Sequence, residues 1–490
     1  MQAATGSINI NDYLKPASVI FFGLMSLLLP LAGIAVAALA GLTEFEKPGL
    51  INVASVIVFI SITVLSLASN KIYFFFLPFV LLAFPTAVND FFPAVYLGSR
   101  GEIGAAAFPF INHIDLFLVA GLVRLFWKKN TLSVHSTWLI AGVFLFFFLS
   151  SFINIVANAG DVHHVCLILA GGYPLRYLFM LLILLSNVDF RLYEKEIVTG
   201  FIVSVFFLFV EALLNTYMTG THFLASGSLG ANTFANIVSS LLVFFVYLRR
   251  LKYRFPPFIF WPLIVVSCLI IVLSETRIAI IAALLSFMLI QLYYYSFIRS
   301  FIVVCVVAIA GIIFVATVDL PKRYSLKHIS SKIHFNFKAD SPLDMVTVER
   351  SEETNSIYSR LKLYKTSARI IADNPVFGTG YGTFNYVKND YGFNENTLID
   401  AHNGYLNTIS QLGLTGIFFL YFIYFFPFFA FNKILEPTVI KYFFIINITM
   451  SIADISNAGI YKYSIFATLA FGAIMLSILK KYSHNGSRTQ

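Results

Sequence analysis

His402 is the residue best suited to chemistry, because it stands just before an apolar run that begins at Leu412. An ionisable side chain at the edge of a hydrocarbon layer is costly to keep there, so it is a functional candidate by default. A free imidazole has a pKa of about 6.5, and its neutral form can take a proton from a hydroxyl group as a general base. Asp400 could orient the ring or cap a helix, and His402 itself could be a capping or interfacial residue.

Two arginines could complement such a base. Arg277 stands between two apolar runs, and Arg360 opens a stretch with helical spacing. A planar guanidinium can hold a phosphate group through two parallel hydrogen bonds. The alternatives are an interfacial anchor or an ion pair with Glu275 for Arg277, and a solvated helix face for Arg360. For Lys362 and Lys365, on the same stretch, the solvated face is the preferred interpretation.

A third arginine, Arg176, falls inside an apolar run and must therefore face the interior of the protein. It is either a structural partner of an acid such as Glu211 or part of a substrate path. His163 and His164 are interpreted as loop residues. No spacing of His or Cys indicates a metal site or a disulfide framework, so no metal and no cofactor are expected.

Composition places the chain among polytopic membrane proteins. Of its 490 residues, 59% are hydrophobic and only 12% are charged, whereas soluble chains average about 25% charged. The net charge of +9 does not indicate nucleic acid, because the positive residues cluster in short loops between apolar runs. The first apolar run, about residues 17–42, is too long for a signal peptide and predicts a first spanning helix.

Runs of roughly 20 apolar residues predict about fourteen spanning helices. The second and third could form a hairpin broken between Asn70 and Lys71, and the count could fall to twelve. The predicted spans are 17–41, 51–69, 72–88, 112–127, 136–158, 167–187, 197–219, 232–248, 256–275, 278–295, 300–318, 412–431, 439–458 and 461–479.

Lysines and arginines set the expected orientation. They follow even-numbered spans, for example Lys128 and Lys129 after the fourth, and Arg249 and Arg250 after the eighth. The positive-inside rule then places both termini in the cytoplasm and the long segment 319–411 outside. The expected organisation is a membrane bundle over 1–318, a periplasmic loop over 319–411, and further spans with a cytoplasmic tail over 412–490.

The second half of the long loop shows local order. Apolar residues at 357, 361, 364, 368 and 371 have helical spacing, and a helix there must stop before Pro375. The Gly-rich segment 377–382 follows this helix rather than a strand. That context predicts a tight turn and not a phosphate-binding loop.

These segments resemble the bacterial O-antigen ligase and polymerase family of integral-membrane glycosyltransferases. The resemblance is most specific over 359–384, 401–406 and 412–416, with further similarity at 274–277 and 230–235. Altogether it spans roughly residues 225–430. The chain departs from the family's pattern at three positions, where a Trp, an acid and a Gly are common and this sequence has Tyr364, Gln411 and Ile278.

The resemblance implies an all-α membrane bundle of about 12–14 helices, with a periplasmic loop containing short helices folded over the outer mouth. It implies a polyprenyl-diphosphate-linked glycan as donor and an acceptor glycan or glycolipid, in the bacterial inner membrane. His402 would activate the acceptor hydroxyl. Arg277 and Arg360 would hold the diphosphate and stabilise the charge that develops as it leaves, without a metal. The remaining substrate-binding candidates are Arg176, Asp400, Asn403 and Tyr381.

Several functions remain open. A polymerase that joins repeat units is slightly favoured over a ligase that passes glycan to lipid A-core, because no feature is tied to a lipid A-core acceptor. A chain-length regulator is a further partner of such an enzyme. From other classes, a polysaccharide transporter or flippase would suit fourteen spans, but transporters tend to have similar halves and charges within several spans. A non-catalytic scaffold is a third interpretation.

Overall fold

The structure is a computed structural model. It describes a few isolated residues together with residues 50–84, 94–97, 106–109, 111–127, 190–219, 231–250, 253–273, 277–294, 332–337, 345–351, 355–380, 383–393 and 401–431.

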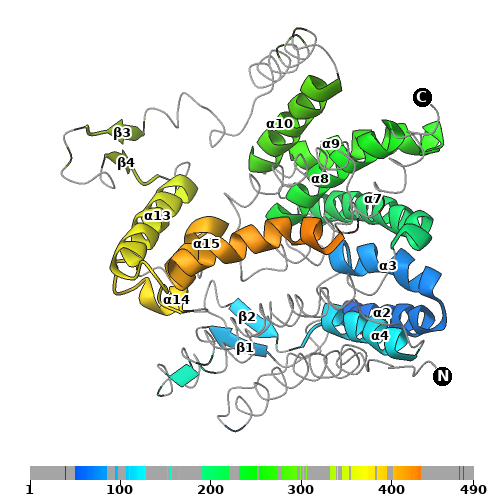
Figure 1. The fold of residues 1–490 in the computed structure, drawn as a ribbon, viewed down its shortest axis with the longest axis horizontal. Coiled ribbons are helices and arrows are strands. Elements are labelled where there is room, and N and C mark those ends of the chain that lie inside the picture. The colour runs from blue at the N-terminus through cyan, green and yellow to red at the C-terminus, as the bar shows by residue number, and fades with distance from the viewer. Residues whose placement is uncertain are drawn as a thin grey trace, which may run out of the picture.

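Within these ranges the chain is mostly helical, as predicted (Figure 1). The α-helices are α2 Leu50–Ala68, α3 Asn70–Leu82, α4 His113–Trp127, α7 Glu194–Thr219, α8 Ala231–Arg250, α9 Pro257–Leu273, α10 Arg277–Tyr294, α13 Asn355–Asp373, α14 Phe384–Val387 and α15 Gly404–Phe431, and the 3-10 helix η2 covers Phe190–Tyr193. Two antiparallel hairpins were not predicted from the sequence. They pair β1 Ala94–Leu97 with β2 Ala106–Pro109, and β3 Ile333–Phe335 with β4 Val346–Val348.

Seven of the predicted apolar runs, between 51–69 and 278–295, coincide with helices α2, α3, α4, α7, α8, α9 and α10. Among the described residues, one helical stretch, Glu194–Leu214, is both long and apolar enough to cross a membrane, and the other apolar helices are shorter. The remaining predicted spans before 412 and after 431 lie outside the described residues. They are 17–41, 136–158, 167–187, 300–318, 439–458 and 461–479.

The predicted break between the second and third runs is present, one residue earlier than expected. Ser69 has an extended backbone, with φ at −144°, and separates α2 from α3. Arg124 of α4 donates to the side-chain oxygen of Asn70 and to the carbonyl of Leu67. Because the last carbonyls of a helix have no partner within it, this guanidinium stabilises the end of α2. The Asn70 amide nitrogen also donates to the Tyr193 hydroxyl, 2.9 Å away.

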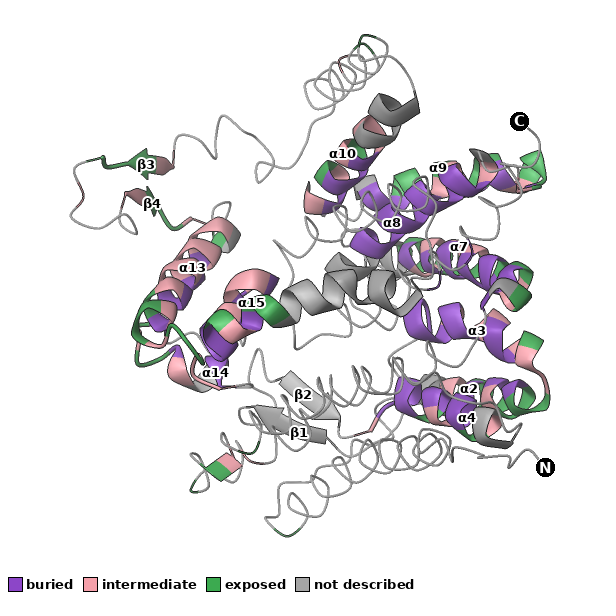
Figure 2. Cartoon of the chain, viewed as in Figure 1, coloured by how far each residue is buried: buried purple, intermediate pink, exposed green. Residues whose placement is uncertain are grey.

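The helices pack side by side through small and apolar residues. α3 packs against α7, where a Cβ at Gly200 would overlap the carbonyl oxygen of Phe75, so the glycine allows the two backbones to approach closely. α8 is buried almost all round between α9 and α10, whereas α2 presents apolar side chains such as Ile57 and Val64 to the outside (Figure 2). An apolar exposed face is what contact with lipid requires.

In Figure 1, α13 and the β3–β4 hairpin lie at the opposite end of the view from α2, α3 and α4, and α15 extends between the two ends. α13 packs against α15 and against β4, and α14 packs against α15. The segment 355–393 therefore forms a cap at the start of α15. This is the segment in which the sequence predicted local order.

Candidate functional site

A small apolar core joins α13 to the start of α15. Its fully buried members are Leu363 and Ile370 of α13 with Phe384, Phe393 and Ala401. The prediction that the helix ends before Pro375 is confirmed, since α13 ends at Asp373. The packed face differs from the predicted apolar stripe, whose members are only half-buried. The buried positions lie on a different face of the helix, one or two residues from the members of that stripe. They are Ser359, Leu363, Thr366, Ser367 and Ile370.

The basic residues of α13 have different environments. Arg360 is half-buried, one turn before Leu363, whereas Arg369 is exposed. The ammonium of Lys362 lies 5.2 Å from the centre of the Phe393 ring. The ammonium of Lys388, which is only 1% exposed, lies 5.6 Å from the same ring. Such contacts stabilise a cation against an aromatic face. Lys362 is half-buried, so its ammonium contacts the Phe393 ring from a partly exposed position on α13.

The Gly-rich segment forms the predicted turn, and it is joined to a kink in α15. The kink is at Gly413, whose φ of 60° and ψ of −149° are not helical. In a regular helix the N–H groups of Leu414 and Thr415 would donate to the carbonyls of Ser410 and Gln411. At the kink these four groups need other partners, since buried backbone polar groups are almost always paired.

The turn supplies those partners. Thr379 N donates to the Ser410 carbonyl at 3.1 Å, and Gly380 N donates to the Gln411 carbonyl at 2.8 Å. In the other direction, Leu414 N donates to the Pro375 carbonyl at 2.8 Å, and Thr415 N donates to the Val376 carbonyl at 3.4 Å. The turn itself is closed by the Thr383 hydroxyl, which donates to the Gly380 carbonyl at 2.6 Å. The turn and the kink therefore complete each other's backbone hydrogen bonding.

His402 lies at the entrance to α15 in an unusual backbone conformation. Its φ is 47°, the left-handed region that non-glycine residues rarely adopt. The side chain is half-buried. The next residue, Asn403, caps the helix, because its side-chain oxygen accepts hydrogen bonds from Tyr405 N and Leu406 N, both at 3.0 Å. Asn403 therefore serves as an N-cap of α15.

A buried network of side-chain amides stabilises the entrance to α15. Asn407 has no exposed surface, and its side-chain oxygen accepts from Ala401 N at 3.4 Å and from the Gln411 amide nitrogen at 3.1 Å. Gln411, also fully buried, donates to the Asn407 carbonyl as well, at 3.0 Å. The same Gln411 offers its own carbonyl to the Gly-rich turn. One network thus links the backbone beside His402 to the kink.

The predicted apolar span 412–431 coincides with the part of α15 that follows the kink at Gly413. The polar helical stretch that starts at Gly404, before the kink, was not predicted. The hydrogen bonds of Asn407 and Gln411 make the burial of this stretch possible. Asn407 was therefore not predicted as a site residue. The signal that could have found it is the polar spacing of 403, 407 and 411, which places three amides on one helix face.

The remaining predicted site residues lie on other elements or outside the described ranges. Arg277 is the first residue of α10, which packs against α8 and α9. Arg360 and His402 belong to two elements that share the small apolar core, through Leu363 and Ala401. Arg176, Asp400 and Tyr381 lie outside the described residues. Within the described ranges, no group of three His, Cys, Asp or Glu side chains is arranged to hold a metal ion.

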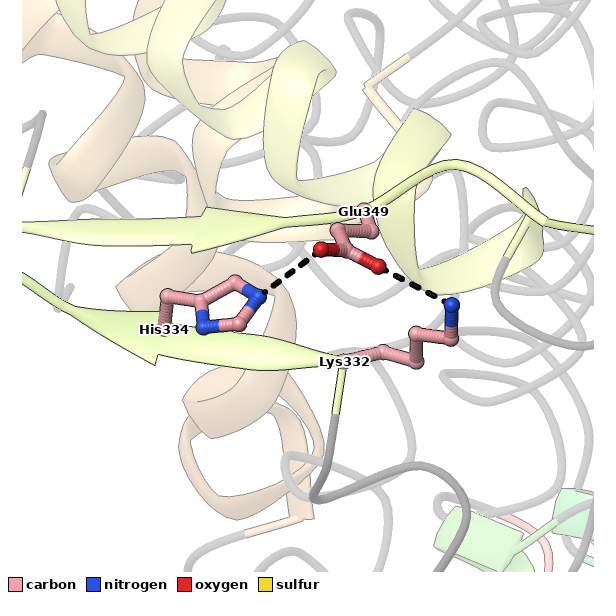
Figure 3. Close-up of polar contacts among 3 residues, drawn as sticks. All are labelled: Lys332, His334 and Glu349. Atoms are coloured by element: carbon pink, nitrogen blue, oxygen red, sulfur yellow. Dashed lines mark hydrogen bonds and ion pairs between the residues drawn. The ribbon is translucent and has the colours of Figure 1, made fainter.

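The β3–β4 hairpin beside α13 carries an exposed charged cluster (Figure 3). The Glu349 carboxylate accepts from the Lys332 ammonium at 2.9 Å, and His334 Nε2 lies 3.2 Å from its other oxygen. The hydrogen bond from Lys332 and then that with His334 lower the pKa of Glu349 below its usual value. On the other face of the hairpin the rings of Phe335 and Phe337 stack with centroids 6.2 Å apart.

Comparison with known protein families gives a match for part of the chain. Residues 262–421, which contain α10, α13 and the entrance to α15, match the family model described as O-Antigen ligase. No curated protein matches the chain at a significant level. The members of the matched family are integral membrane proteins of the bacterial inner membrane that transfer lipid-linked glycans. The match over residues 262–421 supports the predicted membership of the O-antigen ligase and polymerase family.

Proposed function

We propose that the chain transfers a glycan from a polyprenyl-diphosphate carrier to an acceptor hydroxyl on the periplasmic side of the inner membrane, in O-antigen, capsule or exopolysaccharide assembly. The observation that carries this proposal is the conformation of His402. A left-handed non-glycine backbone persists only where the surroundings hold it, and such residues cluster at functional sites. Here the Asn403 cap follows the histidine, and the Asn407 bond to Ala401 N precedes it.

His402 acts as the general base in this reaction. It takes the proton from the acceptor hydroxyl, and the resulting oxygen attacks the anomeric carbon of the donor sugar. The bond between that carbon and the diphosphate oxygen breaks, and the diphosphate leaves with the electron pair. A rigid entrance to α15 favours such a step, because catalysis requires the base and the hydroxyl to be held in one geometry.

Arg277 and Arg360 bind the departing diphosphate. Their guanidinium groups offset the negative charge that grows on the leaving oxygen, so the reaction needs no metal ion. Arg360 suits this role better than the other arginine of α13, because it is half-buried near the small apolar core while Arg369 is exposed. A partly desolvated cation interacts more strongly with a phosphate than a fully solvated one.

The test is release of polyprenyl diphosphate from a labelled lipid-linked glycan by the purified full chain. His402→Ala, Arg277→Ala and Arg360→Ala should each abolish release while the protein remains in the membrane. Arg369→Ala is the matched control for Arg360, on the same helix but exposed, and His334→Ala is the matched control for His402. Full activity of His402→Ala would remove the base assignment, and equal loss in Arg360→Ala and Arg369→Ala would remove the assignment of Arg360.

The polymerase and the ligase share this chemistry and differ in the acceptor. The matching family model is described as O-Antigen ligase, and this keeps the ligase as the second candidate. Deletion of the gene separates the two. Loss of a polymerase leaves single repeat units attached to the cell surface, whereas loss of a ligase leaves no repeat units attached.

A further inference from the structure

Asn236 is a buried amide whose two polar atoms both lack a partner. It lies in the second turn of α8 and is only 4% exposed. Within the part of the chain that the structure describes, neither its side-chain oxygen nor its side-chain nitrogen makes a hydrogen bond. An unpaired buried amide is costly, and native proteins keep few of them. The unpaired amide therefore indicates that a ligand binds at this position.

The position is next to the first turn of α10. One turn along α8 from Asn236, the Ser239 hydroxyl lies 3.1 Å from the carbonyl oxygen of Ala279 and 3.0 Å from that of Ala235. Ala279 is two residues from Arg277, where α10 begins. Residues three apart on a helix share a face, so Asn236 and Ser239 are on the side of α8 that faces α10. The unpaired amide is therefore close to the end of α10 that carries Arg277.

The chemistry of the amide selects its ligand. A side-chain amide has two N–H donors and one acceptor oxygen. An ionised diphosphate only accepts hydrogen bonds, so it would leave the Asn236 oxygen unpaired and would repel it. A sugar hydroxyl both donates and accepts, and it can pair with both atoms of the amide at once.

We propose that Asn236, beside the first turn of α10, forms a subsite for a hydroxyl-bearing sugar of the donor glycan. The inference rests on the proposed function, which places the diphosphate at Arg277 and therefore places the sugar bonded to it nearby. Asn236 contacts the sugar rather than the leaving group. It thereby discriminates a glycosylated carrier from a carrier that has already lost its glycan.

The experiment compares two probes on the purified full chain in lipid nanodiscs. They are a polyprenyl diphosphate that carries the glycan and the same polyprenyl diphosphate without sugar. Asn236→Leu has a similar shape and no hydrogen-bonding groups. It should weaken binding of the glycosylated carrier about tenfold, as loss of neutral hydrogen bonds does, and leave binding of the bare carrier unchanged. Its Tm should not fall, because an apolar side chain replaces an amide that had no protein partner.

Ser267→Ala is the matched control. Ser267 is on α9, is fully buried, and has a hydroxyl without a hydrogen-bond partner among the described residues. Its loss should change neither affinity. Equal weakening of both carriers by Asn236→Leu, together with a lower Tm, would show that the amide holds a structural water and would overturn the subsite. Unchanged affinity for the glycosylated carrier would also overturn it. Wild-type protein that does not bind the glycosylated carrier would instead contradict the proposed function.

Discussion

Gly378 and Gly413 meet at a seam where neither residue can carry a side chain. A Cβ on Gly378 would overlap the backbone carbonyl of Gln411, and a Cβ on Gly413 would overlap the backbone carbonyl of Val376. Both glycines also have a positive φ, of 64° and 60°. The turn after α13 and the kink in α15 thus fit together through two glycines that lie 35 residues apart in sequence, 413 minus 378. This fit determines how α13 is held against the helix that begins beside His402.

Replacement of either glycine by alanine should be strongly destabilising. Gly378→Ala and Gly413→Ala each place a side chain in a left-handed conformation, which costs about 1–2 kcal/mol, and each also forces the backbones apart. We expect each to lower the unfolding free energy by at least about 2 kcal/mol, measured by thermal unfolding in detergent. Gly392→Ala is the control, since Gly392 has a φ of 86° but open space around it. An equal effect of all three would contradict the close fit.

Asn403 should have a role in stability that can be separated from any role in substrate binding. Asn403→Ala removes the cap of α15 and should cost about 1 kcal/mol. Asn403→Ser keeps an N-cap oxygen and should restore the Tm. If Asn403 also contacts substrate, as predicted from the sequence, the serine variant should be stable and still transfer glycan slowly. A serine variant with wild-type rates would show that the side chain serves only as a cap.

Local backbone structure could be predicted in this chain where it depends on short stretches of sequence. Pro375 ends α13, and the glycines after it form a tight turn, because both effects come from the backbone preferences of single residues. The start of α15 was not predictable from hydropathy. Its first two turns are polar, and their burial depends on hydrogen bonds that only the folded network around Asn407 reveals.

The candidate site also combines features that could be predicted from the sequence with features that could not. His402 could be selected from the sequence because an ionisable residue beside an apolar run is rare. Its left-handed backbone could not be predicted, since it results from the way the chain enters α15. The unpaired amide of Asn236 was equally hidden, because a single Asn inside an apolar run gives no indication of which neighbours its side chain has. The β3–β4 hairpin has strands of only three residues, too short for an alternating pattern to be distinguished.

Asn407 should act on catalysis through the position of His402. Asn407→Leu removes the acceptor of Ala401 N and leaves the Gln411 amide without one of its partners, which should cost about 1–3 kcal/mol. Because the backbone beside His402 is then less constrained, we expect kcat to fall more than KM rises, in steady-state assays of glycan transfer. Thr408→Val is the control, since the equally buried Thr408 hydroxyl donates to the Gly404 carbonyl of its own helix, at 2.6 Å.

A change in KM alone, or the same change in both variants, would show that Asn407 has no special relation to His402. Rescue by a conservative change adds a second readout. Asn407→Asp keeps a side-chain oxygen that can accept from Ala401 N, so it should recover part of kcat. A purely structural role would instead make recovery of kcat follow recovery of Tm.

The β3–β4 hairpin should become less stable as the pH falls. The bonds from Lys332 and His334 lower the pKa of Glu349 in the folded hairpin from an ordinary value of 4.5. A carboxylate with a lowered folded pKa contributes stability above its unfolded pKa and loses it as the pH falls through the folded value. Protection of the Glu349 and Asn336 amides, which donate to Lys332 O at 3.0 Å and Met345 O at 2.8 Å, should therefore decline below about pH 4.5.

Hydrogen exchange measured by mass spectrometry on the peptide covering 332–349, corrected for the intrinsic pH dependence of exchange, tests this expectation. Glu349→Gln should lower protection at neutral pH and remove the decline on acidification, because glutamine does not titrate. Asp390→Asn, which neutralises an exposed acid in the turn after α14, should leave the decline unchanged. The same decline in Glu349→Gln as in the wild type would show that another group titrates, since the glutamine variant no longer has the carboxylate that holds Lys332 and His334.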